Sequence, residues 1–364
     1  MIENKKCIKC LMISGRALGD AIIAMGLINE ISSRNVNVRW YVWCRPESLP
    51  IFESSVCVDK IFTSYFPMGF HGNIFKITIL KKIMSCIFQI RRLKPEISVD
   101  LIGDIRESLL GLALGSQQHI APVWPRGHVV NRLIVNPFPK YWKKKCLIPM
   151  ELENIYEVRK LIRNLIESKI FISGPSACSA RLTYTSNAKL ASEETKDCSR
   201  EIIGIHPGAS QKSKLWPVDN WRSLLEKLTQ SGYKLRLYGS SLDLDYLNKI
   251  SSGILDKSFL FTLPVTDFLN DIKKLKLLVC LDSFSAHAAF SCGVPNVMLF
   301  GSNNPHIWVT PNSVPVWNDG GCKFYPCYNR PRCIGSNAEY ICIRSVSVDM
   351  VLKAIDHAIL KSGN

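Results

Sequence analysis

The chain has 364 residues, 47% of them hydrophobic, which is enough for about two globular domains with full cores. No run reaches the roughly 18 apolar residues that a membrane-spanning helix needs, so we expect no integral membrane protein. The formal net charge of +16 indicates an anionic partner. No helix-turn-helix, zinc-finger or aromatic RNA-binding motif accompanies that charge, and we therefore expect no nucleic acid as the partner.

The basic excess belongs to the first half of the chain. Residues 1–150 carry 21 Lys and Arg against 10 Asp and Glu, whereas the rest of the chain carries 25 against 20. Anionic lipid and phosphorylated glycolipid both fit this charge, and a plain solvated surface is the alternative.

The 14 cysteines are expected to be mostly reduced. The start of the sequence, MIENKKCIKCLMI, has a short apolar run but no small-residue cleavage site, so it does not predict a signal peptide. We expect a cytoplasmic protein, and the basic first half leaves open a peripheral contact with the inner face of the cytoplasmic membrane.

Strand and helix patterns alternate along the first half, which is typical of an α/β fold. The predicted strands span residues 7–14, 36–44, 58–63 and 97–102, and the predicted helices span residues 21–31, 75–93 and 154–168. Between residues 122 and 149 the chain is rich in Pro and aromatic residues. The cluster from Tyr141 to Lys145 suits a sugar that carries phosphate or carboxylate.

A basic face follows the helix predicted over residues 75–93, formed by Lys81, Lys82, Arg91, Arg92 and Lys94. Anionic headgroups of a membrane surface would suit it, and a solvated helix face explains it equally well.

Residues 173–199 have no clear periodicity and are predicted to be a linker. We place the domain boundary there, with one domain over residues 1–185 and another over residues 186–364. In the second domain the predicted strands span residues 201–205, 234–238, 259–263, 277–281 and 295–300, and the predicted helices span residues 218–230, 265–276, 285–292 and 346–360.

Polar residues follow the buried strand at residues 277–281: Asp282 and Ser283 come first, and His287 lies on the next short helix. Ligands of open parallel sheets collect at the carboxyl ends of strands, so this is where a site is expected. The structural alternative is that Asp282 and Ser283 cap the helix and His287 is a core residue.

The run D-S-F-S-A-H, followed by a small-residue helix, G-V-P, an apolar strand and F-G, resembles the donor-site motif of glycosyltransferase family 9, the ADP-heptose:lipopolysaccharide heptosyltransferases. The resemblance covers most of the chain and is strongest over residues 201–345. It implies an α/β fold of the GT-B type, with two Rossmann-like domains facing each other across a cleft. It also implies metal-independent, inverting transfer of a heptose or related sugar from an ADP-sugar donor to an anionic saccharide acceptor of the bacterial surface.

The family has Gly where this chain has Phe284. A Gly beside a diphosphate lets the backbone approach the ligand closely, and a Phe narrows that approach. The departure leaves the identity of the donor open.

In the first domain, G-R-A-L-G-D matches the family's R-x-x-G-D, and the resemblance implies that Asp20 is the catalytic base. It implies that Arg16, Asp104 and Arg106 line the acceptor side. As structure alone, Asp20 is expected at or next to the N-cap of a helix.

In the second domain, Lys214, Trp216 and Pro217 match a family loop that holds the donor diphosphate. A lysine ammonium and main-chain amides at a helix start suit a diphosphate physically. The donor-binding residues implied by the resemblance are Ser210, Lys214, Asp243, Asp282, Ser283 and His287. Asp243 would suit a helix N-terminus equally well, and Trp216 and Trp221 would suit a core.

Four cysteines near the end, Cys322, Cys327, Cys333 and Cys342, follow the spacing C-x4-C-x5-C-x8-C. We call them the cysteine cluster. They suggest a structural zinc or iron ion, and reduced buried thiols or one or two disulfides are the alternatives.

Two rival functions remain. A sugar-nucleotide epimerase shares the two-domain architecture but gives no reason for a basic first domain. A non-catalytic glycan- or nucleotide-binding relative of a transferase is suggested by Phe284.

Overall fold

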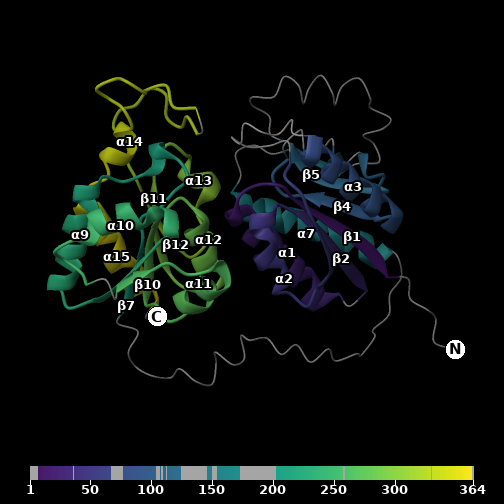
Figure 1. Cartoon of the computed structure of the whole chain (residues 1–364), viewed down its shortest axis with the longest axis horizontal. Helices are drawn as coiled ribbons and strands as arrows, with labels where there is room; N and C mark the ends of the chain where they lie inside the picture. The colour runs from purple at the N-terminus through teal and green to yellow at the C-terminus, as the bar shows by residue number, and fades with distance from the viewer. Residues whose placement is uncertain are drawn as a thin grey trace. The chain divides into compact units, whose positions relative to one another are not determined.

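The structure is a computed structural model, and Figure 1 labels the helices and strands of its described part. The described residues are 7–35, 37–66, 77–103, 107, 110–111, 113–123, 146–149, 154–172, 202–256, 259–328 and 330–362. Two compact units make up the chain, Met1–Ser176 and Ala177–Asn364. The boundary expected between residues 185 and 186 lies outside the described residues.

A six-stranded parallel sheet forms the centre of the first unit, in the order β3-β2-β1-β4-β5-β6. Its strands are β1 (Ile8–Ser14), β2 (Val38–Cys44), β3 (Val58–Thr63), β4 (Ile97–Asp100), β5 (Gln118–Val123) and β6 (Cys146–Pro149). The order reverses between β1 and β4, so the crevice beside their carboxyl ends is the topological switch point of this sheet.

Helices cover this first sheet: α1 (Leu18–Arg34), α2 (Leu49–Glu53), α3 (Ile77–Leu93) and α7 (Ile155–Ile172), with a 3₁₀ turn at Pro46–Ser48. Leu11 and Ile13 of β1 pack with Ile83, Cys86 and Ile90 of α3 in one buried cluster. Alternate residues of a strand point to opposite faces, which is why these two β1 side chains reach the same helix.

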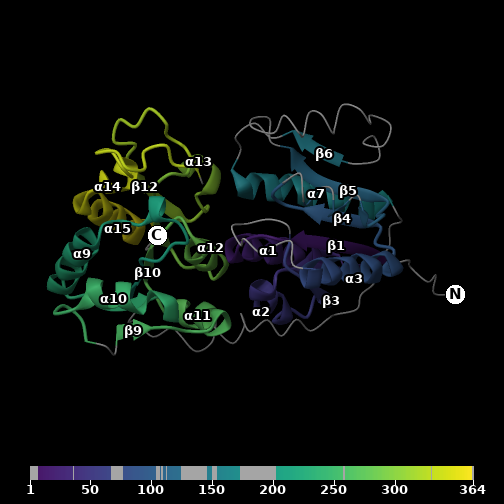
Figure 2. The same ribbon diagram turned by 45° about the horizontal axis from the view of Figure 1, so that its top comes forward.

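The second unit repeats the plan with a parallel sheet in the order β12-β11-β10-β7-β8-β9 (Figure 2). Its strands are β7 (Ile202–His206), β8 (Lys234–Tyr238), β9 (Leu260–Phe261), β10 (Leu277–Leu281), β11 (Asn296–Phe300) and β12 (Ser313–Trp317). The switch point of this sheet lies between β7 and β10. Both sheets therefore have the strand order of a Rossmann fold, as the sequence predicts.

The helices of the second unit are α9 (Val218–Gln230), α10 (Leu244–Ser251), α11 (Val265–Ile272), α12 (Phe284–Ser291), α13 (Pro305–Trp308), α14 (Ile341–Arg344) and α15 (Val348–Ser362), with 3₁₀ turns at Lys212–Lys214 and Ser241–Asp243. Trp216 and Trp221 are fully buried, with ring centroids 4.9 Å apart. The Trp216 indole donates to the carbonyl of Val346 over 2.8 Å. Both tryptophans therefore belong to the hydrophobic core, which is the position that their structural interpretation predicts.

The sequence does not predict β5, β6, β12 or the short helices α2, α10 and α13. Edge strands tolerate Pro because one side of their backbone needs no ladder partner. β12, which contains Pro315, and β6, which ends at Pro149, both lie at sheet edges. Among the helices that the structure describes, none is long and apolar enough to cross a membrane.

Candidate active site

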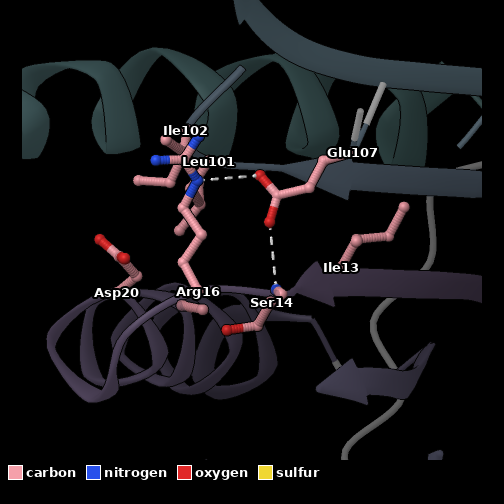
Figure 3. Close-up of a pocket in the computed structure, with 9 residues that line it drawn as sticks. Ile13, Ser14, Arg16, Asp20, Leu101, Ile102 and Glu107 are labelled. Atoms are coloured by element: carbon pink, nitrogen blue, oxygen red, sulfur yellow. Dashed lines mark hydrogen bonds and ion pairs between the residues drawn. The ribbon is translucent and has the colours of Figure 1, made fainter. Parts of the chain in front are cut away.

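The switch point of the first sheet carries a small cavity, shown in Figure 3. Ser14, Gly15 and Arg16 from the end of β1 line it, together with Asp20 of α1 and Leu101 and Ile102 after β4. Its volume is about 10 Å³, close to the smallest space that holds one water molecule.

Asp20 is the third residue of α1, and the N-cap is Ala17. The backbone N–H of Ala17 donates to Asp20 Oδ2 over 3.2 Å. The carboxylate therefore holds the helix start from inside the first turn, where the helix dipole favours a negative charge. The sequence predicts Asp20 at the N-cap or directly next to it, and this is corrected: Asp20 lies two positions further into the helix. Ala17 is the N-cap, and the Asp20 carboxylate accepts from its backbone N–H.

Glu107 anchors the loop after β1, and sequence analysis missed it. Its side chain is 1% exposed. Glu107 Oε1 accepts from the N–H of Gly15 over 3.1 Å, and Oε2 lies 3.5 Å from Nε of Arg16. Figure 3 shows the carboxylate bridging these two groups. Glu107 thus fixes both the turn and the predicted acceptor residue Arg16.

A second buried carboxyl group, Asp100, lies at the end of β4 and accepts from the N–H groups of Ile102 over 2.8 Å and Gly103 over 3.1 Å. Burial raises the pKa of Asp100 to about 6, against the opposing effect of these hydrogen bonds and of Arg16. Burial, and then the neighbouring Asp100 carboxyl, raise the pKa of Glu107 well above its usual value. The charge of the Asp100 carboxylate therefore opposes ionisation of Glu107. In the sequence, Asp100 lies in the strand and Glu107 follows after it. Hydrophobic periodicity does not predict that these two carboxyl groups meet.

Two further acceptor residues expected from the resemblance, Asp104 and Arg106, lie outside the described residues.

At the switch point of the second sheet, an ion pair joins the loops after β7 and β10. Lys214 Nζ lies 2.9 Å from Asp282 Oδ2 and donates to the Asp282 carbonyl over 3.1 Å. The Asn303 amide donates to the same Oδ2 over 2.5 Å. The side chains of Lys214 and Asp282 are 13% and 5% exposed. The structure thus brings together two of the predicted donor residues and adds Asn303 to them.

Close backbone packing holds this arrangement. A Cβ on Gly301, after β11, would lie 2.2 Å from the carbonyl oxygen of Ser213, so only glycine fits there. The hydroxyls of Ser213 and Ser302 are 2.9 Å apart, and both residues are buried. The 3₁₀ turn that carries Lys214 is therefore locked against the end of β11.

Helix α12 starts at this cluster. Its N-cap residue is Ser283, whose side chain caps no backbone N–H and lies 3.0 Å from the Ser285 hydroxyl. Amides at a helix N-terminus suit an anion. Phe284, the first helical residue, packs against Phe268 of α11 with ring centroids 5.6 Å apart. The aromatic side chain that replaces the family's Gly thus has a partner on the neighbouring helix.

His287 lies one turn further along α12 and is buried. Burial lowers its pKa to about 4, with Asp282 opposing the shift and Lys214 adding to it. The imidazole is therefore neutral at pH 7. Its expected role in donor binding stays a prediction.

Two predicted donor residues lie on the neighbouring loops. Asp243 Oδ2 accepts from the N–H of Ser240 over 2.9 Å and from its hydroxyl over 2.6 Å, so Asp243 caps the turn after β8. A Cβ on Gly208 would lie 3.6 Å from Asp243 Oδ2, which places the loop after β7 beside this carboxylate. Ser210 is exposed on the same loop.

The thiols of the cysteine cluster are free, as are those of the other cysteines that the structure describes. Burial, followed by the neighbouring thiols Cys333 and Cys322, raises the pKa of Cys327. Burial raises that of Cys342 to about 11. Within the described ranges no group of three or more His, Cys, Asp or Glu is placed to hold a metal ion. The structure thus brings the four cysteines into one neighbourhood, and the metal ion that the sequence suggests stays a prediction.

Sequence analysis also missed a basic hollow of about 380 Å³ lined by Lys323, Phe324, Tyr325, Arg330 and Arg332 among others. The side-chain Nζ of Lys323 lies 5.2 Å and the guanidinium of Arg332 lies 5.5 Å from the centre of the Phe324 ring. The Tyr325 hydroxyl donates to the carbonyl of Asn303 over 2.9 Å, which ties the hollow to the cluster around Asp282.

Comparison with known proteins finds similarity to one family over part of this chain. Residues 159–330 match the model of glycosyltransferase family 9 (heptosyltransferase). A segment of 105 residues is 27% identical to lipopolysaccharide heptosyltransferase 1 of Pseudomonas aeruginosa, and the match spans 29% of this chain and 29% of that protein.

Two solved structures share the fold. The glycosyl transferase family 9 protein from Veillonella parvula superimposes with a TM-score of 0.67 at 16% identity, over 98% of each chain. The heptosyltransferase WaaC of E. coli, solved with ADP, gives 0.68 at 12% identity, over 96% of this chain and 100% of that one. The expected resemblance and the α/β fold of the GT-B type are confirmed.

Proposed function

We propose that this chain is an inverting glycosyltransferase, because it resembles glycosyltransferase family 9. It moves a heptose, or a related sugar, from an ADP-linked donor to an anionic saccharide acceptor of the bacterial surface. The observation that carries the proposal is the cluster of Lys214, Asp282 and Asn303 at the switch point of the second sheet, beside the start of α12 and within the residues that match the family model.

On the donor side, the diphosphate lies against the N-terminus of α12 and the turn that carries Lys214. The negative charge that develops on the leaving diphosphate is stabilised by these amides and by the lysine ammonium, a contribution that is often large in catalysis. Asp282 keeps Lys214 in place before the donor arrives. Ser210, Asp243, Ser283 and His287 complete the donor site. That WaaC was solved with ADP supports an adenine nucleotide here.

On the acceptor side, Asp20 takes the proton of an acceptor hydroxyl. The hydroxyl oxygen bonds to the anomeric carbon while the bond from that carbon to the diphosphate oxygen breaks, and ADP leaves. Attack opposite to the leaving group inverts the anomeric carbon. Arg16, Asp104 and Arg106 bind the acceptor, whose negative charge fits the basic first half. No step requires a metal ion, and a zinc or iron ion at the cysteine cluster would be structural.

We place the reaction in the cytoplasm, where the free thiols of the described cysteines would stay reduced. The second candidate is a relative that binds a nucleotide or glycan without transfer, which Phe284 favours because it occupies the start of α12.

A panel of ADP-, UDP- and GDP-linked sugars separates these functions. Calorimetry measures which are bound, and mass spectrometry measures release of the nucleotide with and without a phosphorylated heptose-containing glycolipid. The proposal predicts ADP-sugar binding and acceptor-dependent release of ADP. Binding without turnover favours the second candidate, and interconversion of a UDP-sugar with its epimer would identify an epimerase.

A further inference from the structure

Helix α3 exposes an apolar stripe that lies outside the buried core formed by the described residues of its unit. Ile77, Leu80, Met84 and Phe88 are 68%, 57%, 58% and 57% exposed. Their spacing of three, four and four residues places them on one face of the helix. The opposite face, with Ile83 among its residues, packs into the core. An exposed row of four large apolar side chains on one helix is the mark of an interaction surface.

The charges on the same helix have one sign. The helix contains no Asp or Glu, whereas Lys81, Lys82, Arg91 and Arg92 are all exposed, and Lys94 follows just after it. None of these basic residues forms an ion pair with another described residue. The Arg92 guanidinium lies 4.3 Å from the centre of the Phe88 ring. Basic and apolar groups thus share one exposed face.

We propose that this face of α3, the stripe of Ile77, Leu80, Met84 and Phe88 with its flanking basic residues, docks the protein onto an anionic lipid surface. The apolar side chains enter the boundary between headgroups and acyl chains, and the ammonium and guanidinium groups pair with lipid phosphates. A second copy of the chain is a poorer occupant, because two such faces would bring like charges together with no acidic residue of the helix to offset them.

The proposal goes beyond the proposed function, because it concerns where the protein is held and not what it transfers. Vesicle binding needs neither donor nor acceptor, so it can fail while sugar transfer stands, and the reverse also holds.

The test is co-flotation of the full chain with vesicles of phosphatidylglycerol and phosphatidylethanolamine, compared with vesicles of phosphatidylcholine alone. The protein should float with the anionic vesicles, and salt should release it because surface charge is screened. The triple variant Leu80→Ser, Met84→Ser and Phe88→Ser should lower the partition coefficient at least 10-fold. Lys81→Gln with Arg91→Gln and Arg92→Gln should abolish the preference for anionic vesicles.

Matched controls come from apolar residues elsewhere that are even more exposed than the stripe. Val56, Leu242 and Leu360 are 87%, 94% and 72% exposed, and their replacement by Ser should leave flotation unchanged. Circular dichroism verifies that each variant is folded. The proposal is overturned if the parent does not float, if the control and stripe variants lose binding equally, or if light scattering finds a dimer that the stripe variant abolishes.

Discussion

The ion pair between Lys214 and Asp282 gives two substitutions that should differ in their effect on ADP binding. Lys214→Ala removes a cation from the proposed diphosphate site and leaves the Asp282 carboxylate there, held by Asn303 alone. Losing a charge-assisted hydrogen bond costs about 1.5–3 kcal/mol, or roughly 10- to 150-fold in Kd. Asp282→Asn removes the negative charge instead, so ADP affinity should stay within a few-fold of the parent or increase.

Stability should respond differently from binding. Both side chains of the pair are largely buried, and removing one partner of a buried pair costs about 3–5 kcal/mol of the free energy of unfolding. Lys214→Ala should therefore melt earlier while remaining folded at 25 °C. The matched control is Lys212→Ala, on the same 3₁₀ turn but exposed, which should change neither property much.

Isothermal titration calorimetry with ADP, together with thermal unfolding of each variant, measures both effects. A folded Lys214→Ala protein that binds ADP as tightly as the parent would refute the reasoning. So would a Lys212→Ala protein that loses as much affinity as Lys214→Ala, because a general loss of basic charge would then explain the result.

The remaining predictions concern the carboxyl pair, the cysteine cluster and the start of α12. Because burial raises the pKa of Asp100 to about 6 in the folded protein, the free energy of unfolding should be highest below pH 4 and should decline as the pH rises through 6. Glu107→Gln, whose amide can donate to Asp100, should flatten that decline in chemical denaturation between pH 4 and 8, and an unchanged slope would contradict the coupling of the two carboxyl groups. The metal prediction is decided by elemental analysis of protein purified without chelator: about one equivalent of zinc or iron supports it, and a folded, metal-free sample rules it out. Phe284→Gly should raise the affinity for ADP-heptose several-fold by opening the start of α12, and an unchanged Kd would show that the Phe284 side chain does not limit the donor site.

The sequence predicts the parallel strands well where they are fully apolar. β10, whose five residues are all buried, is matched at both ends. The bounds of β3, which contains Asp59 and Lys60, and of helix α9 are matched as well. The sequence does not predict β5, because Gln118, His119 and Pro122 interrupt its apolar pattern. In the structure His119 is nevertheless buried. Tertiary context overrides strand propensity at such positions.

The arrangement of the candidate site could be predicted only in part, through residues at the carboxyl ends of strands. Lys214 and Asp282 were each expected at the donor site, but they are 68 residues apart in the sequence, and only the strand order makes them an ion pair. Glu107 was missed for the same reason. A buried carboxyl group such as Glu107 is identified as a site residue by its neighbour in space, here Asp100. No local sequence pattern predicts that neighbour.

Turnover of the Asp20→Asn protein tests the central claim, that this chain transfers a sugar with Asp20 as the base. Asn can accept the same hydrogen bond from the N–H of Ala17, so the melting temperature and the ADP affinity should change little. The rate of acceptor-dependent ADP release, measured with saturating donor and acceptor, should fall by roughly 10²–10⁴-fold. A variant that turns over within a few-fold of the parent would contradict the account.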